Sequence, residues 1–315
     1  ARLLRVLASS ELAVPHWGTT RGGDYLRGRY EQGKQTQTYA EDRGKAVASL
    51  EEARDLLAKT PAAPAKERAS IDVELALAVA RFTQFDSTWG WWWSPDNGPD
   101  DGLADAEGDD ENAGRYVNRS WSAELSRAKP HGLPVTQNGD VVFTPAPPAY
   151  APTLNDTAKI KFLLGEAQQI DDDPNKEIAG QALLQQALLF RTRDGGERLD
   201  RLRNWWWAGS YPYRDVAKDD ELYQLGDDEV ITLVATGVRK VTVPADESVP
   251  RLFAEVQRKY PRSKASDEAQ SLLGLFYQSR EQYPKAVAAY EQYVKAHPKG
   301  EHTSEVTSVL AVIRA

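Results

Sequence analysis

Apolar residues recur at helical spacing along much of this chain. Between residues 38 and 60, five of them fall on one stripe, Ala46, Leu50, Ala53, Leu56 and Leu57. This spacing predicts an amphipathic helix that buries one side. Similar patterns predict helices over residues 1–11, 66–85, 155–170 and 173–193. In the last of these, Asp173 is expected to cap the helix and Pro174 to occupy its first turn.

The most regular pattern covers residues 267–300, DEAQSLLGLFYQSREQYPKAVAAYEQYVKAHPKG. Its small and large residues match the order of a tetratricopeptide (TPR) helix pair, namely Leu273, Gly274, Tyr277, Ala286, Tyr290 and Pro298. Residues 250–260 resemble the second helix of a preceding unit. Residues 301–314 predict a final helix, since an end repeat needs a cover for its apolar side. Tyr293 stands where a small residue is usual, which indicates either a looser or an aromatic-filled contact with that final helix.

The middle of the chain is less regular. Residues 96–112, DNGPDDGLADAEGDDEN, are acidic and glycine-rich and predict a long exposed loop. Residues 134–145 contain two short β-prone runs around Asn138–Gly139, the dipeptide that suits a two-residue hairpin turn. We interpret residues 15–24 as a loop, residues 228–236 as a short helix and residues 238–244 as an extended connector.

These patterns predict a mostly α-helical fold, an irregular α-solenoid or TPR-like helical array with an inserted loop and β-hairpin. Four regions are expected. They are an N-terminal helical region (1–95), an acidic loop and β-hairpin insertion (96–152), a middle helical region (153–248), and TPR-like helices with a C-terminal cap (249–315).

Composition narrows the classes of function. The 315 residues suffice for one large core or two smaller ones. The formal charge of −8 and the lack of a basic run argue against nucleic-acid binding, and no apolar run is long enough to predict a membrane span. Without cysteine, disulfides, thiolate sites and an internal thioester are excluded. The chain also lacks methionine and opens inside a helical pattern, so we expect a fragment or a processed product.

Few residues suggest chemistry. The four histidines, His16, His131, His297 and His302, lie in separate segments, and no phosphate-binding or serine-hydrolase motif is present. No catalytic residue, metal site or cofactor is therefore predicted. The acidic loop could offer calcium its carboxylates, Asp96, Asp100, Asp101, Asp105, Asp109, Asp110 and Glu111. Their spacing does not fit an EF-hand, and a solvated loop is the simpler interpretation.

Two tryptophan clusters stand out. The first contains Trp89, Trp91, Trp92 and Trp93, and the second Trp205, Trp206 and Trp207. Tryptophan buries a large area at a low entropy cost, so dense clusters favour packing or contact with another domain. A platform on which sugars stack is the alternative.

Three segments carry a family resemblance. HWGTTRGGDYLRGRY (16–30), WGWWW (89–93) and LYQLGDDEVITLVATGVRKVTVP (222–244) resemble the N-terminal helical region of large bacterial, planctomycete-type alpha-2-macroglobulin-family proteins. Residues 259–300 look like TPR units of bacterial envelope proteins. The resemblance implies an exported protein of the periplasm or cell envelope. Some family members trap proteases through a thioester, which this chain cannot form because it lacks cysteine, so we expect an accessory scaffold.

The leading hypothesis is a non-enzymatic TPR-like scaffold that binds a protein or peptide partner, or neighbouring domains of a longer chain. The positions that usually line the groove of a TPR unit match Glu268, Ser271, Leu275, Gln278 and Ser279. One alternative is a carbohydrate-binding or carbohydrate-active helical domain that uses the tryptophan clusters. Another is a calcium-dependent adhesive or structural piece.

Overall fold

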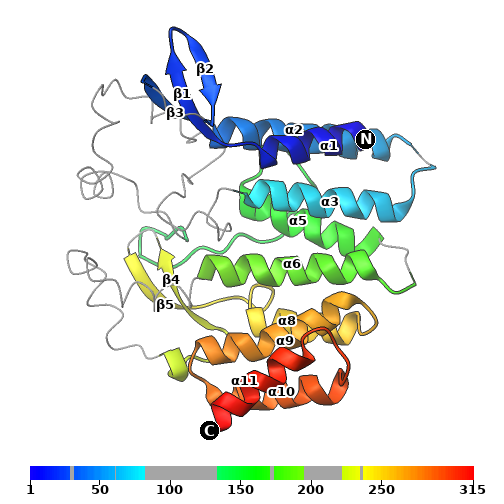
Figure 1. Ribbon diagram of the computed structural model, residues 1–315, viewed down its shortest axis with the longest axis vertical. Helices are drawn as coiled ribbons and strands as arrows, with labels where there is room; N and C mark the ends of the chain where they lie inside the picture. The colour runs from blue at the N-terminus through cyan, green and yellow to red at the C-terminus, as the bar shows by residue number, and fades with distance from the viewer. Residues whose placement is uncertain (29–31, 61, 82–132, 171–173, 195–221, 235–236) are drawn as a thin grey trace. The chain divides into compact units, whose positions relative to one another are not determined.

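The computed structural model describes residues 1–28, 32–60, 62–81, 133–170, 174–194, 222–234 and 237–315 (Figure 1). Within these residues the fold is mostly helical, as predicted. The chain forms two compact units. Unit 1 comprises Ala1–His131 and Ala146–Leu163, and unit 2 comprises Gly132–Pro145 and Leu164–Ala315. The helix α5 (Asp156–Ile170) contributes residues to both.

Unit 1 contains three helices that pack in chain order, α1 (Arg2–Ala13), α2 (Tyr39–Ala58) and α3 (Ala65–Ala80). Four members of the predicted α2 stripe are buried, and Leu56 remains 43% exposed. The α3 helix ends at Ala80 because Arg81 adopts an extended backbone. The apolar periodicity thus identified the helices and the side that each one buries.

A three-stranded antiparallel sheet follows α1. Its strands are β1 (Trp17–Arg21), β2 (Asp24–Arg27) and β3 (Lys34–Gln37), in the order β2-β1-β3. The predicted loop over residues 15–24 was therefore wrong. Gly22 and Gly23 have φ values of +60° and +92°, and positive φ at two successive residues makes the tight turn that joins β1 to β2.

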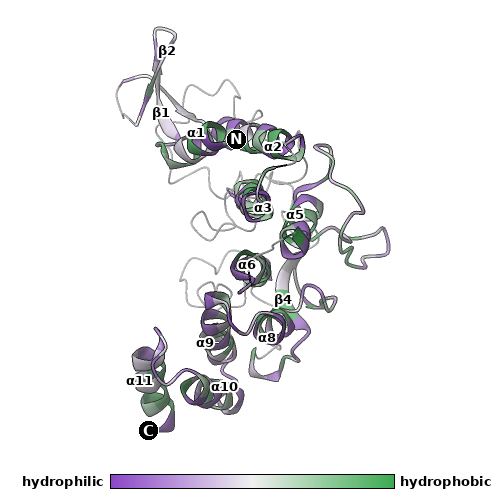
Figure 2. Ribbon diagram, turned by 90° about the vertical axis from the view of Figure 1, so that its right-hand side faces the viewer, coloured by the Kyte–Doolittle hydropathy of each residue, from purple (hydrophilic) through white to green (hydrophobic). Residues whose placement is uncertain are grey.

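Unit 2 contains α6 (Glu177–Asp194), α8 (Val249–Lys259), α9 (Lys264–Ser279), α10 (Tyr283–Ala296) and α11 (Thr303–Arg314). The α6 helix contacts α8 and α9, α8 contacts α9, and α10 contacts both α9 and α11. Figure 2 views α6, α8, α9 and α10 nearly end on. The predicted start of α6 at Pro174 was wrong, because Lys176 has a φ of +53° and the helix begins only at Glu177. Asp173, its expected cap, lies outside the described residues.

Two hairpins form a small second core in unit 2. The strands β4 (Glu229–Val234) and β5 (Gly237–Thr242) pair antiparallel, so the helix predicted over residues 228–236 was wrong. Their β-branched residues favour a strand. The hairpin predicted around Asn138–Gly139 is present, with Val135 opposite Val141 and a φ of +87° at Gly139. Side chains from both hairpins bury one another: Leu133, Val230, Val241 and Val243, with Val135, Val141 and Phe143 against them.

The units cut across two of the expected regions, since residues 153–163 of the expected middle region belong to unit 1 and its remaining residues belong to unit 2. Within the predicted insertion 96–152, residues 132–145 belong to unit 2 and residues 146–152 to unit 1. Residues 96–132 lie outside the described part of the chain.

Candidate partner-binding face

The α9 helix carries all five residues predicted to contact a partner. Glu177 of α6 accepts the backbone N–H of Lys264 on both carboxylate oxygens, at 3.2 Å each. A carboxylate at this position satisfies a first-turn N–H and favours the positive end of the helix dipole. The start of α9 is therefore fixed by a side chain from a distant part of the sequence.

The five predicted residues share one side of α9. Glu268, Ser271, Leu275, Gln278 and Ser279 recur at spacings of three, four and seven, which align side chains along a helix. Leu275 is 40% exposed, and the other four are partly buried. The structure thus brings the predicted residues together with an apolar side chain near their centre.

Several polar groups on this side are already hydrogen-bonded. The Ser271 hydroxyl donates to the Glu268 carbonyl at 2.9 Å, and the Ser279 hydroxyl donates to the Phe276 carbonyl at 2.8 Å. The Tyr290 hydroxyl of α10 donates to the Gln278 side-chain oxygen at 2.8 Å. Both serine hydrogens are consequently used within the helix, and Gln278 presents its amide nitrogen.

A close approach of helices supports the back of this face. A Cβ on Gly274 would lie 2.8 Å from Tyr290 Cζ, so glycine leaves the space that the ring fills. Burial raises the pKa of Tyr290 to about 12. Gly274 and Tyr290, two of the residues that match the TPR pattern, therefore act as a size match between α9 and α10.

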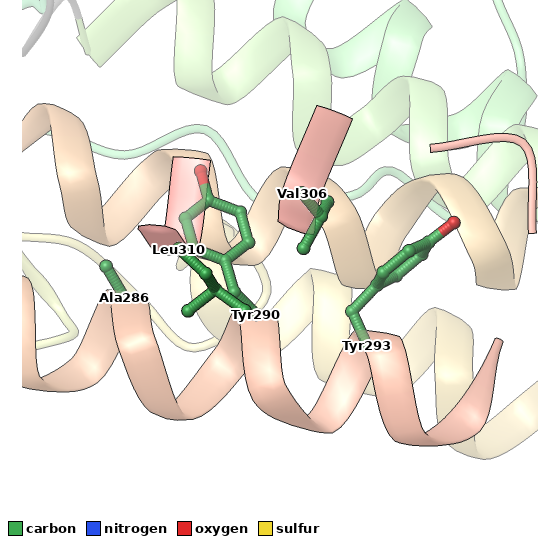
Figure 3. Close-up of a cluster of buried hydrophobic side chains, with 5 residues drawn as sticks. All are labelled: Ala286, Tyr290, Tyr293, Val306 and Leu310. Carbon is green, nitrogen blue, oxygen red and sulfur yellow. The ribbon is translucent and has the colours of Figure 1, made fainter. Parts of the chain in front are cut away.

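The α11 helix covers the next side of α10. Figure 3 shows side chains of both helices pointing toward one another, Ala286, Tyr290 and Tyr293 from α10 with Val306 and Leu310 from α11. Tyr293 is fully buried, its hydroxyl accepts the backbone N–H of His302 at 3.1 Å, and its ring stacks on His297 at 5.2 Å. Tyr293 thus fills the contact with the final helix, so the aromatic-filled alternative is the one observed.

The LYQLGDDE segment is bound to the α9–α10 turn largely through its own backbone. Gln282 donates its amide to the carbonyls of Leu225 and Tyr223, at 2.7 and 3.2 Å. Arg280 donates to the Gly226 carbonyl at 3.3 Å, and burial lowers the pKa of Arg280 to about 10.

The two aspartates of this segment are paired as well. Lys285 of α10 binds Asp227 at 2.7 Å, and Arg251 of α8 binds Asp228, also at 2.7 Å. The pairing with Arg251 lowers the pKa of Asp228. The LYQLGDDE segment therefore has a structural role in unit 2.

Buried charges join α6 to the chain that precedes α8. Arg193 pairs with Glu247 at 2.5 Å and with Asp194 at 2.8 Å, and it lies 4.6 Å from the centre of the Phe190 ring. Burial raises the pKa of Asp194, although Arg193 acts in the opposite direction. Breaking such a pair would leave an uncompensated charge in the interior. The cluster therefore fixes α6 beside the start of α8.

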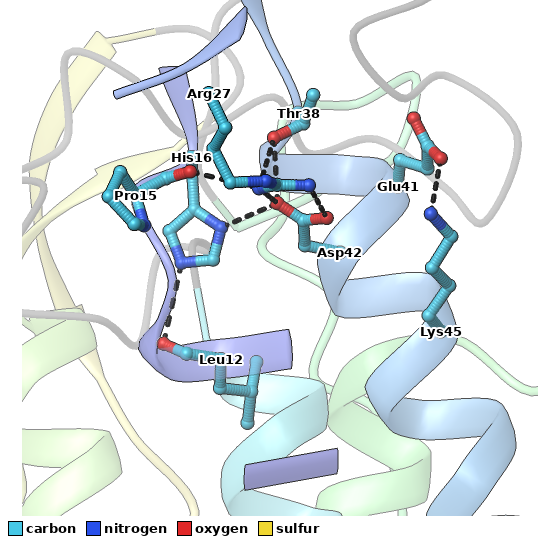
Figure 4. Close-up of polar contacts among 8 residues, drawn as sticks. All are labelled: Leu12, Pro15, His16, Arg27, Thr38, Glu41, Asp42 and Lys45. Atoms are coloured by element: carbon cyan, nitrogen blue, oxygen red, sulfur yellow. Dashed lines mark hydrogen bonds and ion pairs between the residues drawn. The ribbon is translucent and has the colours of Figure 1, made fainter. Parts of the chain in front are cut away.

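Unit 1 has a polar cluster centred on Asp42 (Figure 4). The Asp42 carboxylate accepts a hydrogen bond from Arg27 on each of its two oxygens, at 2.6 and 3.0 Å. It also accepts a hydrogen bond from the Thr38 hydroxyl at 2.7 Å and is hydrogen-bonded to His16 Nδ1 at 2.8 Å. His16 Nε2 faces the Leu12 carbonyl at 3.4 Å. Both ring nitrogens of the buried His16 thus meet acceptors within the protein, which makes the cluster a junction between the sheet and α2.

Other predicted sites lie outside the described residues. Trp91, Trp92, Trp93, Trp205, Trp206 and Trp207 do so, as does the acidic loop considered for calcium. Among the residues that the structure does describe, no group of three or more histidines, aspartates or glutamates could hold a metal ion. None of the described helices combines the length and hydropathy needed to cross a membrane.

Comparisons with protein-family models, with curated proteins and with solved structures found no match to this chain. The candidate face is therefore defined by the contacts of the chain itself.

Sequence patterns missed the partner of α8. Residues 250–260 were predicted to form the second helix of a preceding pair, and they correspond to α8. The structure shows that α6 packs against α8 and so takes the place of the first helix of that pair. Residues 195–248 lie between the two, so no short repeat period connects them. The small residue Gly180 was the available signal, since a Cβ there would lie 3.3 Å from the Cβ of Tyr260, the residue that ends α8.

Proposed function

We propose that this chain is a non-enzymatic helical scaffold that docks a protein or peptide partner on the exposed side of α9. The observation that carries the proposal is the shared position of Glu268, Ser271, Leu275, Gln278 and Ser279, with Leu275 40% exposed among them. An apolar side chain at the surface, framed by polar groups on a rigid helix, is a common form of contact site.

The packing of unit 2 supports this proposal. The contacts of α6 with α8 and of α9 with α10 give two successive helix pairs, and α11 follows the second. Stacked helix pairs expose one side of their first helices as an extended surface for binding. Of the proposed contact residues, all five belong to such a first helix.

The resemblance to alpha-2-macroglobulin-family proteins supports a more specific proposal. On that basis the scaffold is an accessory region of an exported, envelope-located protein. Fractionation of cells that express the full reading frame tests it, with recovery in the periplasm or envelope as the expected result. Exclusive recovery in the cytosol would contradict the localisation and leave the proposed docking face untouched.

A selection from displayed random peptides tests the docking face. We expect the selection to yield peptides that bind the wild-type chain. These peptides should bind the Leu275→Glu variant about tenfold or more weakly, because a charge would replace the apolar contact. Leu56→Glu is a matched control, since Leu56 is 43% exposed on a helix of the other unit. Circular dichroism verifies that both variants fold. Failure to enrich any peptide, or equal binding by the two variants, would overturn the proposed function.

A further inference from the structure

A proline-rich stretch connects the hairpin at Asn138–Gly139 to α5. Residues 144–148 read Thr-Pro-Ala-Pro-Pro, and we call them the proline segment. Each proline fixes its own φ at about −65°, and the residue before a proline is restricted to extended backbone. One or both of these restrictions apply to every residue of the proline segment. The sequence therefore favours a polyproline II helix here.

The backbone around the proline segment is open to a partner. Within the described part of the chain, residues 143–150 form no hydrogen bond through their backbone groups. A polyproline II helix has no internal hydrogen bonds, and its carbonyl groups remain solvated. The chain bends at Pro148 and Ala149, which ends the segment. The carbonyl groups of the proline segment can consequently accept hydrogen bonds from another molecule.

Exposure along this stretch repeats every third residue. Thr144, Pro147 and Tyr150 are partly buried, and the residues between them are exposed. A polyproline II helix has three residues per turn, so residues three apart lie along one edge. One edge therefore faces the protein, while Pro145 and Pro148 lie on an exposed edge, about 9 Å apart.

Unit 1 holds the end of this stretch through Tyr150. The Tyr150 hydroxyl donates to the Glu51 carboxylate of α2, and its ring centre lies 6.0 Å from that of Phe162 on α5. The Arg54 guanidinium lies 5.0 Å from the centre of the Tyr150 ring. A partner that needed the tyrosine would have to break these contacts, so recognition is left to the prolines.

The sequence around the proline segment is uncharged. Residues 141–155 contain no Asp, Glu, Lys or Arg and are the longest such stretch of the chain, in which 27% of residues are charged. A proline-rich connection also serves as a semi-rigid spacer. Stiffness alone does not require an exposed apolar edge, whereas aromatic-lined grooves that take up a polyproline II helix pack on such an edge. The exposed prolines therefore favour recognition over a spacer alone.

We propose that the proline segment binds a partner protein whose groove is lined with aromatic side chains. The groove takes up Pro145 and Pro148 and donates hydrogen bonds to the carbonyl groups of the segment. The segment is one continuous stretch of chain, so its recognition depends on no particular placement of the two units. It shares no residue with the docking face proposed on α9, and neither needs the other.

The probe is a displayed library of SH3 domains that keep the aromatic groove and vary in the surrounding loops, selected against the whole chain. We expect bound clones that a synthetic peptide of residues 142–151 displaces. The double substitution Pro145→Ala and Pro148→Ala should weaken these clones about tenfold or more, because it removes both rings and the stiffness that they impose. Pro152→Ala, at an exposed proline outside the segment, is the control and should bind as the wild type does.

Circular dichroism verifies that the variants fold, and displacement by the peptide does not depend on their folding. A selection that yields no clone would overturn the inference. So would clones that the peptide fails to displace, or that bind the double variant as tightly as the wild type. The clones should bind the Leu275→Glu variant unchanged, so a failure here leaves the proposed function standing.

Discussion

Two junctions, one in each unit, are held together by different physical interactions. In unit 2, α9 meets α10 where Gly274 leaves space for Tyr290, and apolar side chains of α10 and α11 close around them. In unit 1, the sheet meets α2 at Asp42, a fully buried carboxylate bound by Arg27, Thr38 and His16. The first junction depends on shape, and the second depends on charge pairing away from water.

The difference predicts how each junction responds to change. A shape match is disturbed by added volume and is insensitive to pH in the acid range. A buried charge cluster is disturbed by loss of one partner, because the groups left behind are desolvated and unpaired. Substitutions and acid should therefore separate the two junctions.

The largest effect is expected for Asp42→Ala. The change leaves Arg27 and His16 without their carboxylate, and removing one partner of a buried ion pair costs about 3–5 kcal/mol. We expect the free energy of unfolding of unit 1 to fall by about this amount, measured by hydrogen–deuterium exchange of α1 and α2. Asp55→Ala, at an exposed position of the same helix, should change it by less than about 0.5 kcal/mol. Similar exchange in both variants would show that the cluster does not hold the sheet.

Acid should weaken the Asp42 junction more gently. Burial acts to raise the pKa of Asp42, but the hydrogen bonds from Arg27, Thr38 and His16 outweigh it and lower the pKa to about 2, from 3.8. A lowered folded-state pKa stabilises the fold above the unfolded value, and this stability is lost as the pH falls from about 4 toward about 2. The loss amounts to about 2 kcal/mol.

Urea denaturation at about pH 5 and about pH 2 measures this loss. Asp42→Asn is the reference, because it keeps the shape of the side chain without the titrating group. The wild-type chain should lose about 2 kcal/mol more than Asp42→Asn over this range. An equal loss in the two proteins would exclude Asp42 as the source of the acid sensitivity.

The shape junction should respond to Gly274→Ala. The added methyl group would meet the buried ring of Tyr290, and overpacking of this kind costs about 1–3 kcal/mol. We expect faster hydrogen exchange in α9 and α10, with α2 unaffected. A partial rescue by Tyr290→Leu, which makes room for the methyl group, would confirm the steric cause. A neutral Gly274→Ala variant would contradict the size match.

The two junctions also differ in how far the sequence predicts them. The apolar stripe that includes Ala46 and Leu50 depends on the spacing within one helix, so periodicity found it. Gly274 and Tyr290 were found as positions of the TPR pattern, and the structure adds that they meet between two neighbouring helices. The Asp42 cluster joins residues from a loop, a short strand and a helix that share no period. The strands of that sheet have four or five residues, too few for alternation to distinguish them from a loop.

The same limit applies to the candidate face. The side of α9 that holds Leu275 was predicted because its residues match the positions that usually line the groove of a TPR unit. The position of α6 beside α8 and α9 was not predicted, since residues 195–248 separate α6 from the helices that follow it. Local patterns predict which side of a helix is exposed, and tertiary contacts decide which helix lies beside it.

The smallest effect, with the opposite sign, is expected for Gly44→Ala. Gly44 is an exposed residue inside α2, and a Cβ there would meet nothing within 4 Å. Alanine lowers the conformational entropy of the unfolded chain without a clash, so the variant should gain about 0.5–1 kcal/mol of stability. Hydrogen exchange of α2 measures the gain. The same substitution at Gly274 should destabilise the fold. Comparing Gly44→Ala with Gly274→Ala therefore tests whether the surrounding space, rather than helix propensity, decides the sign of the change in stability. Destabilisation in both variants would refute this explanation.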